Sequence, residues 1–360
     1  MLLTEHQRLS TSGARAVAPF TVAGVQYLAV PQLARDMPDT PAHMNGGDSD
    51  TGAPIYRWQD GRFVDDSILP LSGGEDIAVF AFNGEQYLAA AGVRRGHGPY
   101  DYNIDQVLYK HTGSGWSPFQ SFPGFAAKQW SFFELGGRAF LALAQGVTLG
   151  HIAATNPRQS RIFAWDGSRF ADFQTLDGQW GYNWEAFAIG GRSLLCYADH
   201  VGDSAIMEWT GTAFVPFQTL STTAGRCFRR FDVDGETYLT FANIQGETTL
   251  YRWDGVRFAV HQTLSGPGGR ELCVVRTATK LYLVQINFIE GQPSAPVTNL
   301  MSRIYGWSDG RLHLLEEFPT AGGTDAATFQ VDGAIYLAVS NSLTPDVRFR
   351  TDTVIYRFNG

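Results

Sequence analysis

The chain repeats one pattern of four short apolar segments seven times. A clear copy spans residues 220–264, where four apolar runs are separated by turns that contain glycine. The first run carries two large residues two positions apart, Phe231 and Val233, and the third contains the tripeptide Tyr-Arg-Trp. Self-similarity with a period of about 20 to 50 residues indicates a repeat architecture. Seven copies of four short strands predict an all-β fold, a seven-bladed β-propeller with four-stranded antiparallel blades.

The four segments are named strands A to D in chain order. Between strands C and D most copies carry a pair such as Asp254-Gly255, which accepts positive φ and favours a tight hairpin. A hydrophobic anchor ends strand D in every copy. The anchors are Leu9, Leu69, Phe122, Leu176, Leu220, Leu264 and Phe318.

The first ten residues fit the pattern as a strand D that the seventh copy lacks. The last residues, 358–360, end at the turn that follows strand C, and residues 6–9 align with residues 261–264. We therefore expect the N-terminal segment to complete blade 7 and close the ring, which leaves no open strand edge between the first and last blades. Residues 1–360 are predicted to form a single domain.

These elements resemble the EAR repeat, also called the EPTP or epitempin repeat. In the copy at 220–264 the characteristic motifs read F-x-V-x-G, Y-L-T-F-A-N, L-Y-R-W-x-G and H-Q-x-L. The resemblance covers essentially the whole chain and rests on the sevenfold recurrence. It implies a propeller that acts as a protein-binding module without known catalysis. Because this chain shows neither a signal peptide nor a companion domain of the family, the family's extracellular partners are not carried over.

Composition narrows the expected partners and the compartment. The formal net charge is −8, which argues against nucleic acid because duplex affinity comes mainly from clustered Lys and Arg. No signal peptide is recognised at the N-terminus, and no run reaches the roughly 18 apolar residues of a membrane span, so no membrane partner is expected. Cys196, Cys227 and Cys273 are odd in number and lie in three different repeats. This arrangement favours a reducing cytoplasm.

Function is expected on the face that carries the B-to-C loops. These loops differ widely in length, whereas the A-to-B turns are uniformly tight, and variable loops on a rigid scaffold concentrate function. The short loops at 199–204 and 243–248 predict a cleft open toward blades 4 and 5. Aromatic residues outside the repeating positions are expected to bind a ligand. These are Trp130, Trp180, Tyr182, Trp184, Tyr100 and Tyr102. Packing between blades explains Trp130 and Trp184 equally well.

One opposite-charge pair interrupts a row of mainly small residues on strand A. Glu185 and Arg229 occupy equivalent positions in blades 4 and 5, so a structural ion pair and a ligand-facing acid and cation are both open. If the protein is an enzyme, the acid and base candidates are these two residues and three loop histidines, because imidazole titrates near neutral pH. The histidines are His97, His151 and His200. Solvated loop histidines are the simpler explanation.

A second row on strand A contains three acids. Asp76, Glu271 and Asp325 occupy equivalent positions in blades 2, 6 and 7. Like charges that converge usually need a counter-ion or a proton, which raises the hypothesis of a structural calcium ion in the channel. The other four copies weaken it, because they carry Ala16, Gln129, Asn183 and Cys227. No other cofactor is expected.

Two functions fit these features. The first is a non-catalytic recognition platform that binds a protein or small-molecule ligand on the B-to-C loop face, at the channel mouth. The alternative is a cofactor-independent enzyme, such as a cyclase or lyase of small-molecule biosynthesis, with its acid and base in the same pocket. The fold does not choose between them. A deep apolar pocket favours the enzyme, and a flat exposed aromatic patch favours the platform.

Overall fold

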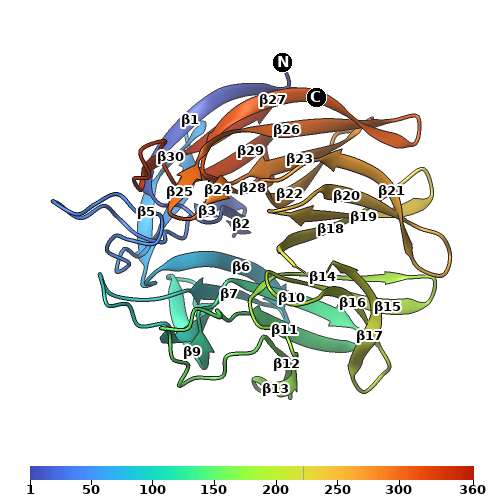
Figure 1. Ribbon diagram of the computed structural model, residues 1–360, viewed down its shortest axis with the longest axis horizontal. Helices are drawn as coiled ribbons and strands as arrows, with labels where there is room; N and C mark the ends of the chain where they lie inside the picture. Colours follow the sequence, from blue (N-terminus) through green and yellow to red (C-terminus); the bar gives the residue numbers. More distant parts are fainter. Residues whose placement is uncertain (222) are drawn as a thin grey trace. The chain divides into compact units, whose positions relative to one another are not determined.

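The computed structural model describes residues 1–221 and 223–360. These residues form strands and turns without any helix, and therefore contain no helix able to cross a membrane. Seven antiparallel sheets of four strands each make up the blades of a β-propeller (Figure 1), and an eighth sheet is a two-stranded hairpin. The predicted fold class is confirmed.

The chain divides into two compact units. The first unit comprises Met1–Ile77, Arg95–Tyr100 and Gly266–Gly360, and the second comprises Ala78–Arg94 and Asp101–Ser265. Blades 1, 6 and 7 belong to the first unit. Blades 2 to 5 belong to the second, apart from the first residues of blade 2. The expectation of one domain over residues 1–360 stays a prediction.

The first unit contains three blades whose strands fall where the repeat predicts them. Blade 1 consists of β2 (Ala18–Val22), β3 (Val25–Ala29), β4 (Ala53–Gln59) and β5 (Arg62–Leu69). Blade 6 consists of β22 (Gly269–Arg276), β23 (Leu281–Asn287), β26 (Asn299–Ser308) and β27 (Arg311–Ala321). Blade 7 consists of β28 (Gly323–Val331), β29 (Ala334–Asn341), β30 (Arg350–Phe358) and β1 (Leu3–Ser12). The hairpin of β24 (Glu290–Gln292) and β25 (Ala295–Val297) extends the B-to-C loop of blade 6 and was not predicted.

The second unit contains the remaining blades. Blade 2 consists of β6 (Gly74–Phe82), β7 (Glu85–Gly92), β8 (Asn103–His111) and β9 (Trp116–Phe125). Blade 3 consists of β10 (Gln129–Leu135), β11 (Arg138–Ala144), β12 (Arg161–Trp165) and β13 (Phe170–Thr175). Blade 4 consists of β14 (Gly181–Ile189), β15 (Arg192–Asp199), β16 (Ser204–Trp209) and β17 (Phe214–Ser221). Blade 5 consists of β18 (Gly225–Val233), β19 (Glu236–Asn243), β20 (Thr248–Trp253) and β21 (Phe258–Ser265). The B-to-C loops of blades 4 and 5 are short, as predicted.

The N-terminal strand completes blade 7. Strand β1 pairs with β30 in antiparallel register, with Leu3 opposite Phe358 and Leu9 opposite Thr353. The side chain of Leu9 is only 5% exposed and packs in a hydrophobic cluster with Phe63 of blade 1 and Ile355 of blade 7. The predicted closure is confirmed, because β1 supplies both the missing strand and part of the core between two blades.

One glutamine of strand D fastens its blade to the next. Gln174 of blade 3 donates its side-chain Nε2 to the carbonyl of Phe214 at 2.7 Å and accepts the backbone N–H of Phe214 at 2.9 Å. Phe214 begins strand D of blade 4, and a side-chain amide can satisfy both its backbone groups because it carries a donor and an acceptor. The same two-way bond joins Gln7 to Phe63, Gln120 to Phe170 and Gln218 to Phe258. The glutamine of the H-Q-x-L motif is therefore a joint between blades.

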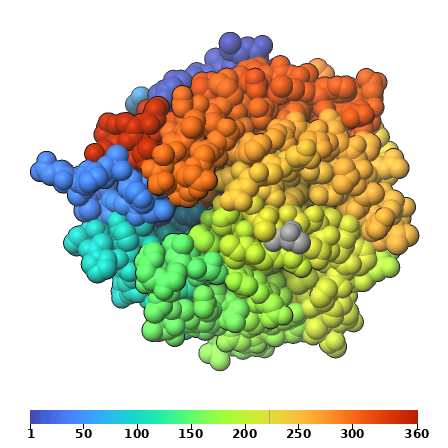
Figure 2. All heavy atoms as spheres, in the orientation of Figure 1, coloured from blue at the N-terminus to red at the C-terminus, as the bar shows by residue number. Residues whose placement is uncertain are grey.

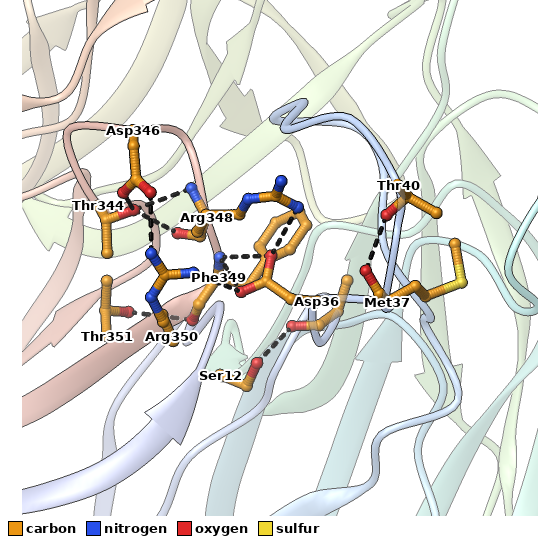
Figure 3. A network of polar contacts seen from close by, with 11 residues as sticks. Ser12, Asp36, Met37, Thr40, Thr344, Asp346, Arg348, Phe349, Arg350 and Thr351 are labelled. Atoms are coloured by element: carbon orange, nitrogen blue, oxygen red, sulfur yellow. Dashed lines mark hydrogen bonds and ion pairs between the residues drawn. The ribbon is translucent and has the colours of Figure 1, made fainter.

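The long loops of blades 1 and 7 are tied together in the first unit. Asp36, in the β3–β4 loop, accepts the backbone N–H of Phe349 at 3.2 Å and lies 3.9 Å from the guanidinium of Arg348 (Figure 3). Beyond this contact the β3–β4 loop is mostly exposed over residues 38–43 and stands out from the surface (Figure 2, blue, at left). The base of this loop is thus fixed while its tip faces solvent.

Deletion of residues 1–10 should destabilise the protein, because blade 7 loses a strand and the core loses Leu3 and Leu9. Burial of the two leucines alone contributes about 3 to 6 kcal/mol, and the exposed edge of β30 should promote self-association. Thermal unfolding and light scattering measure both effects. The control is the full-length protein with Glu5→Ala, which removes an exposed ion pair with Arg8 on the same strand. This substitution should change the free energy of unfolding by at most about 1 kcal/mol. A deletion variant that melts and elutes like the parent contradicts the closure.

Candidate functional site

The first strands of blades 3, 4 and 5 border a small pocket in the second unit. The pocket lies beside β10, β14 and β18 and has a volume of about 270 Å³. Its lining residues are Gln129, Trp130, Ser131, Phe132, Phe133, Asn183, Trp184, Glu185, Ala186 and Arg229. The structure therefore brings together four residues that the sequence singled out: Trp130, Trp184, Glu185 and Arg229.

Glu185 and Arg229 form an ion pair across two blades. The Nη1 atom of Arg229 lies 3.2 Å from Oε2 of Glu185, and Oε1 of Glu185 accepts the backbone N–H of Arg230 at 3.2 Å. The side chain of Glu185 is 17% exposed and that of Arg229 is 35% exposed. The acid is thus fixed against β18, while the guanidinium still reaches solvent at the pocket.

Two amide side chains link the strands that form the pocket wall. Oε1 of Gln129 accepts the backbone N–H of Trp184 at 3.0 Å and Nδ2 of Asn183 at 3.2 Å. Oδ1 of Asn183 in turn accepts the backbone N–H of Phe228 at 2.7 Å. Within residues 1–221 and 223–360, Nε2 of Gln129 and the hydroxyl of Ser131 have no partner. The pocket therefore offers a guanidinium, an amide N–H₂, a hydroxyl and a carboxylate.

Sequence reasoning included Gln129 and Asn183 in the row of strand A residues without giving them a function. The sequence did contain a signal for a linking role, because two uncharged amides stand in adjacent blades at the position where other blades carry Ala16, Cys227 or an acid. An amide can accept a backbone N–H and still donate.

The tryptophans of the pocket pack into the hydrophobic clusters of the blades. Trp130 is 2% exposed and donates its Nε1–H to the carbonyl of Ala90 at 3.1 Å. Trp184 is 3% exposed, and its ring lies 4.6 Å from that of Tyr197. The packing alternative fits both tryptophans. Both line the pocket, but because they are almost fully buried they do not form an open aromatic surface.

A second group of predicted residues meets at the loops of blade 4. Nδ1 of His200 lies 2.8 Å from Nη1 of Arg226, and the His200 ring contacts Trp180 edge-on at 5.0 Å and Tyr182 at 6.2 Å. The guanidinium of Arg226 stacks on the ring of Tyr182 at 4.0 Å. Sequence reasoning missed Arg226, which follows the repeat's Gly225 as one of several polar residues at that position.

The protonation state of His200 follows from its surroundings. Burial first, and then the charge of Arg226, lower the pKa of His200 to about 4, against an opposing effect of Asp199. The imidazole is therefore neutral at pH 7. Because Arg226 is always a donor, Nδ1 must accept and Nε2 carries the proton. Nδ1 then accepts a hydrogen bond from Arg226 and Nε2 already carries a proton, so neither ring nitrogen is available to act as a general base.

The other predicted residues lie elsewhere. His97 and His151 are exposed, in the β7–β8 and β11–β12 loops. Tyr100 belongs to the first unit, where its hydroxyl donates to the carbonyl of Gly47 at 2.7 Å. Tyr102 belongs to the second unit and is half-buried.

Two of the three acids of the channel hypothesis accept hydrogen bonds from backbone N–H groups. Asp325 accepts Val17 N–H at 2.9 Å through Oδ2 and Ala326 N–H at 2.7 Å through Oδ1. Oε1 of Glu271 accepts Leu272 N–H at 3.2 Å. In the described part of the chain, which omits residue 222, no three His, Cys, Asp or Glu residues group so as to hold a metal ion. The calcium hypothesis stays a prediction that this donor set does not strengthen.

The free energy of unfolding should decrease as the pH is lowered through the range where His200 titrates. An unfolded histidine has a pKa near 6.5, and the folded pKa is about 4. The contribution of neutral His200 to the stability of the folded state is therefore complete above about pH 6.5 and is lost as the pH falls toward 4. The melting temperature of the parent, relative to that of His200→Gln, should decrease between pH 7.5 and 4.5. The same comparison with His151→Gln, on an exposed loop, should stay flat. A His200→Gln difference that is constant or grows on acidification contradicts the buried neutral imidazole.

Comparison with known proteins identifies the family. The model of the EPTP domain matches residues 3–59, 169–210, 213–254 and 314–359, which is more than half of the chain. A human and a mouse "Thrombospondin-type laminin G domain and EAR repeat-containing protein" are each 27% identical, over 200 and 207 residues. Each match covers 54% of this chain but only 27% of the relative's own length.

A solved structure supports the fold alone. The "putative 6-phosphogluconolactonase" of Bacteroides uniformis aligns with a TM-score of 0.61 at 13% identity, over 89% of this chain and 91% of its own. At that identity the likeness carries no activity. The family model and the sevenfold repeat agree with each other. The chain belongs to the EPTP family of EAR-repeat proteins.

Proposed function

We propose that the chain is a non-catalytic recognition module whose pocket beside β10, β14 and β18 receives one polar group of a polypeptide partner. The observation that carries the proposal is the partly exposed guanidinium of Arg229 in a pocket with further hydrogen-bond donors. Membership in the EPTP family supports it at a coarser level, since such a propeller is consistent with a protein-interaction platform.

The size of the pocket supports a side chain or chain terminus as the bound group. Sites for drug-sized molecules have about 300 to 1,000 Å³, whereas this pocket has about 270 Å³. Arg229, Nε2 of Gln129 and the hydroxyl of Ser131 are all donors, which favours an incoming carboxylate. A guanidinium has five N–H donors, so Arg229 can hold Glu185 and the carboxylate of a partner together.

The enzyme alternative has no specific observation in its favour. Glu185 accepts hydrogen bonds from Arg229 and from the backbone of Arg230, and a neutral His200 has both ring nitrogens assigned. The two remaining histidine candidates are on exposed loops. We therefore keep the recognition module as the proposal.

A displayed library of random peptides, selected on the intact chain and counter-selected on Arg229→Met, tests the proposal. Enriched peptides should share an acidic side chain or a free C-terminal carboxylate. They should bind Arg229→Met about tenfold or more weakly, since a hydrogen bond between charged groups contributes about 1.5 to 3 kcal/mol. Glu185→Gln should weaken binding less, because the glutamine keeps the shape but orients Arg229 less strongly.

Stability measurements on the same variants separate recognition from a structural role. A pair with a 35% exposed arginine should contribute about 1 kcal/mol or less to folding, and Ser131→Ala serves as a neutral comparison. If either charge substitution lowers the free energy of unfolding by about 3 to 5 kcal/mol, as for a buried structural pair, the ion pair is a structural contact between blades. Equal enrichment on the parent and on Arg229→Met would also remove it as the binding site.

A further inference from the structure

Blade 4 departs from the repeat at the connection that leads into its first strand. The position three residues before Asn183 and its equivalents is Gly or Ala with a positive φ in the other six copies. These are Gly13 (59°), Gly73 (54°), Ala126 (51°), Ala224 (60°), Gly268 (99°) and Gly322 (53°). Blade 4 carries Trp180 there, which is not among the residues with positive φ in the described chain. A large side chain is disfavoured in the left-handed region, so the backbone has changed together with the residue.

The N–H of this position also changes its partner. In blade 5 the N–H of Ala224 donates to the carbonyl of His200 at 2.7 Å, which belongs to the preceding blade. The same bond to a preceding blade is made at Gly13, Gly73, Ala126 and Gly322. The N–H of Trp180 instead donates to Oδ2 of Asp199, in its own blade, at 2.9 Å.

Asp199 is the second departure and is coupled to the first. Strand B ends with an asparagine in blades 5, 6 and 7, at Asn243, Asn287 and Asn341, and with Asp199 in blade 4. The carboxylate is fully buried and accepts five hydrogen bonds. The donors are the N–H groups of Gln179, Trp180, Val201 and Gly202 and the hydroxyl of Tyr197. Asp199 thus fixes the backbone on both sides of His200 and holds Trp180 beside it.

Trp180, Tyr182, His200 and Arg226 form what we name the blade 4 cluster. Tyr182 and Arg226 each lie at a β-bulge, where the register shifts between Gly181 and Asn183 and between Gly225 and Cys227. Bulges re-aim side chains and occur often beside functional sites. Among the described residues the buried Nε1–H of Trp180 has no partner, and Nε2–H of His200 has none. A ligand that reaches Nε2–H of His200 must therefore bring an acceptor.

We propose that the blade 4 cluster is a second binding site, for a carboxylate carried on a flat aromatic group. The carboxylate accepts Nε2–H of His200. Arg226 is a positioning residue, because its bond to Nδ1 keeps the proton on Nε2, and its nearby positive charge favours an anion over a neutral group. The half-buried rings of Trp180 and Tyr182 provide flat surfaces for the aromatic part. The site is independent of the pocket at Glu185 and Arg229.

Benzoate is a suitable probe, and the Cε1–H resonance of His200 reports its binding. The resonance is assigned by its loss in His200→Gln. Benzoate should shift it saturably at pH 7 and raise the pKa of His200, because a bound anion favours the imidazolium. Benzyl alcohol has the same ring without the charge and should leave the resonance in place, and acetate should bind more weakly than benzoate. Equal shifts with benzoate and benzyl alcohol, or no saturable shift with benzoate, would overturn the proposal.

Variants separate a binding site from a packing cluster. Arg226→Met should weaken benzoate binding about tenfold or more, and Trp180→Gly, which restores the residue of the other repeats, should also weaken it. His151→Gln, on an exposed loop, should leave benzoate binding unchanged. If Arg226→Met does not fold, benzoate binding is measured with Trp180→Ala, which changes a half-buried residue and should also weaken binding. A folded variant of either residue that binds benzoate like the parent contradicts the assignment. Peptide binding at Arg229 is measured separately, so failure of one site is distinguishable from failure of the other.

Discussion

The two-way bond between a strand D glutamine and the backbone of the next strand D joins blade 7 to blade 1 in the first unit, and blades 2 to 3, 3 to 4 and 4 to 5 in the second. Each bond satisfies one N–H and one carbonyl of a strand edge, as between Gln218 and Phe258. Leaving a partly buried backbone group unsatisfied costs about 1 to 3 kcal/mol. Because Gln7 makes the same bond to Phe63, the N-terminal strand belongs to this system. A scaffold joined in this way leaves the loops and first strands available for recognition.

The first strands are linked by a different set of side chains, and this produces the chemistry of the pocket. Gln129 and Asn183 use their amide oxygens to accept N–H groups of the next blade, as Asp325 does through its carboxylate in the first unit. The amide nitrogen of Gln129 then remains for a ligand. The proposed recognition in this second unit thus depends on the same hydrogen bonds that align neighbouring blades.

Strand β14 contributes residues to both proposed sites, and a β-bulge lies between them. Asn183 and Glu185 lie in the regular ladder and line the pocket. Tyr182 sits at the register shift and stacks against Arg226. The pocket offers a partly exposed guanidinium, whereas the blade 4 cluster offers the N–H of a neutral imidazole. Under the two proposals, the two sites prefer anions for different reasons.

The repeat made most of the fold predictable, since every blade repeats the same alternation and the N-terminal strand D matches residues 261–264. The same register predicted that Glu185 and Arg229 would be neighbours. The hairpin β24–β25 could not be predicted, because its three-residue strands are mostly exposed and carry no alternating pattern. The burial of Trp130 could not be predicted either, because it depends on which neighbouring blade the side chain faces. Comparing the seven copies at the position of Trp180 would have revealed the blade 4 cluster, since only there is the small residue replaced.

Amide hydrogen exchange with and without a selected acidic peptide tests the central claim, recognition at the first strands of blades 3 to 5, most directly. The account predicts slower exchange in residues 129–133 and 183–186 and around Arg229, with no change in β13, β17 and β21. Protection confined to those outer strands, or no protection at the first strands while the peptide is bound, would contradict the account.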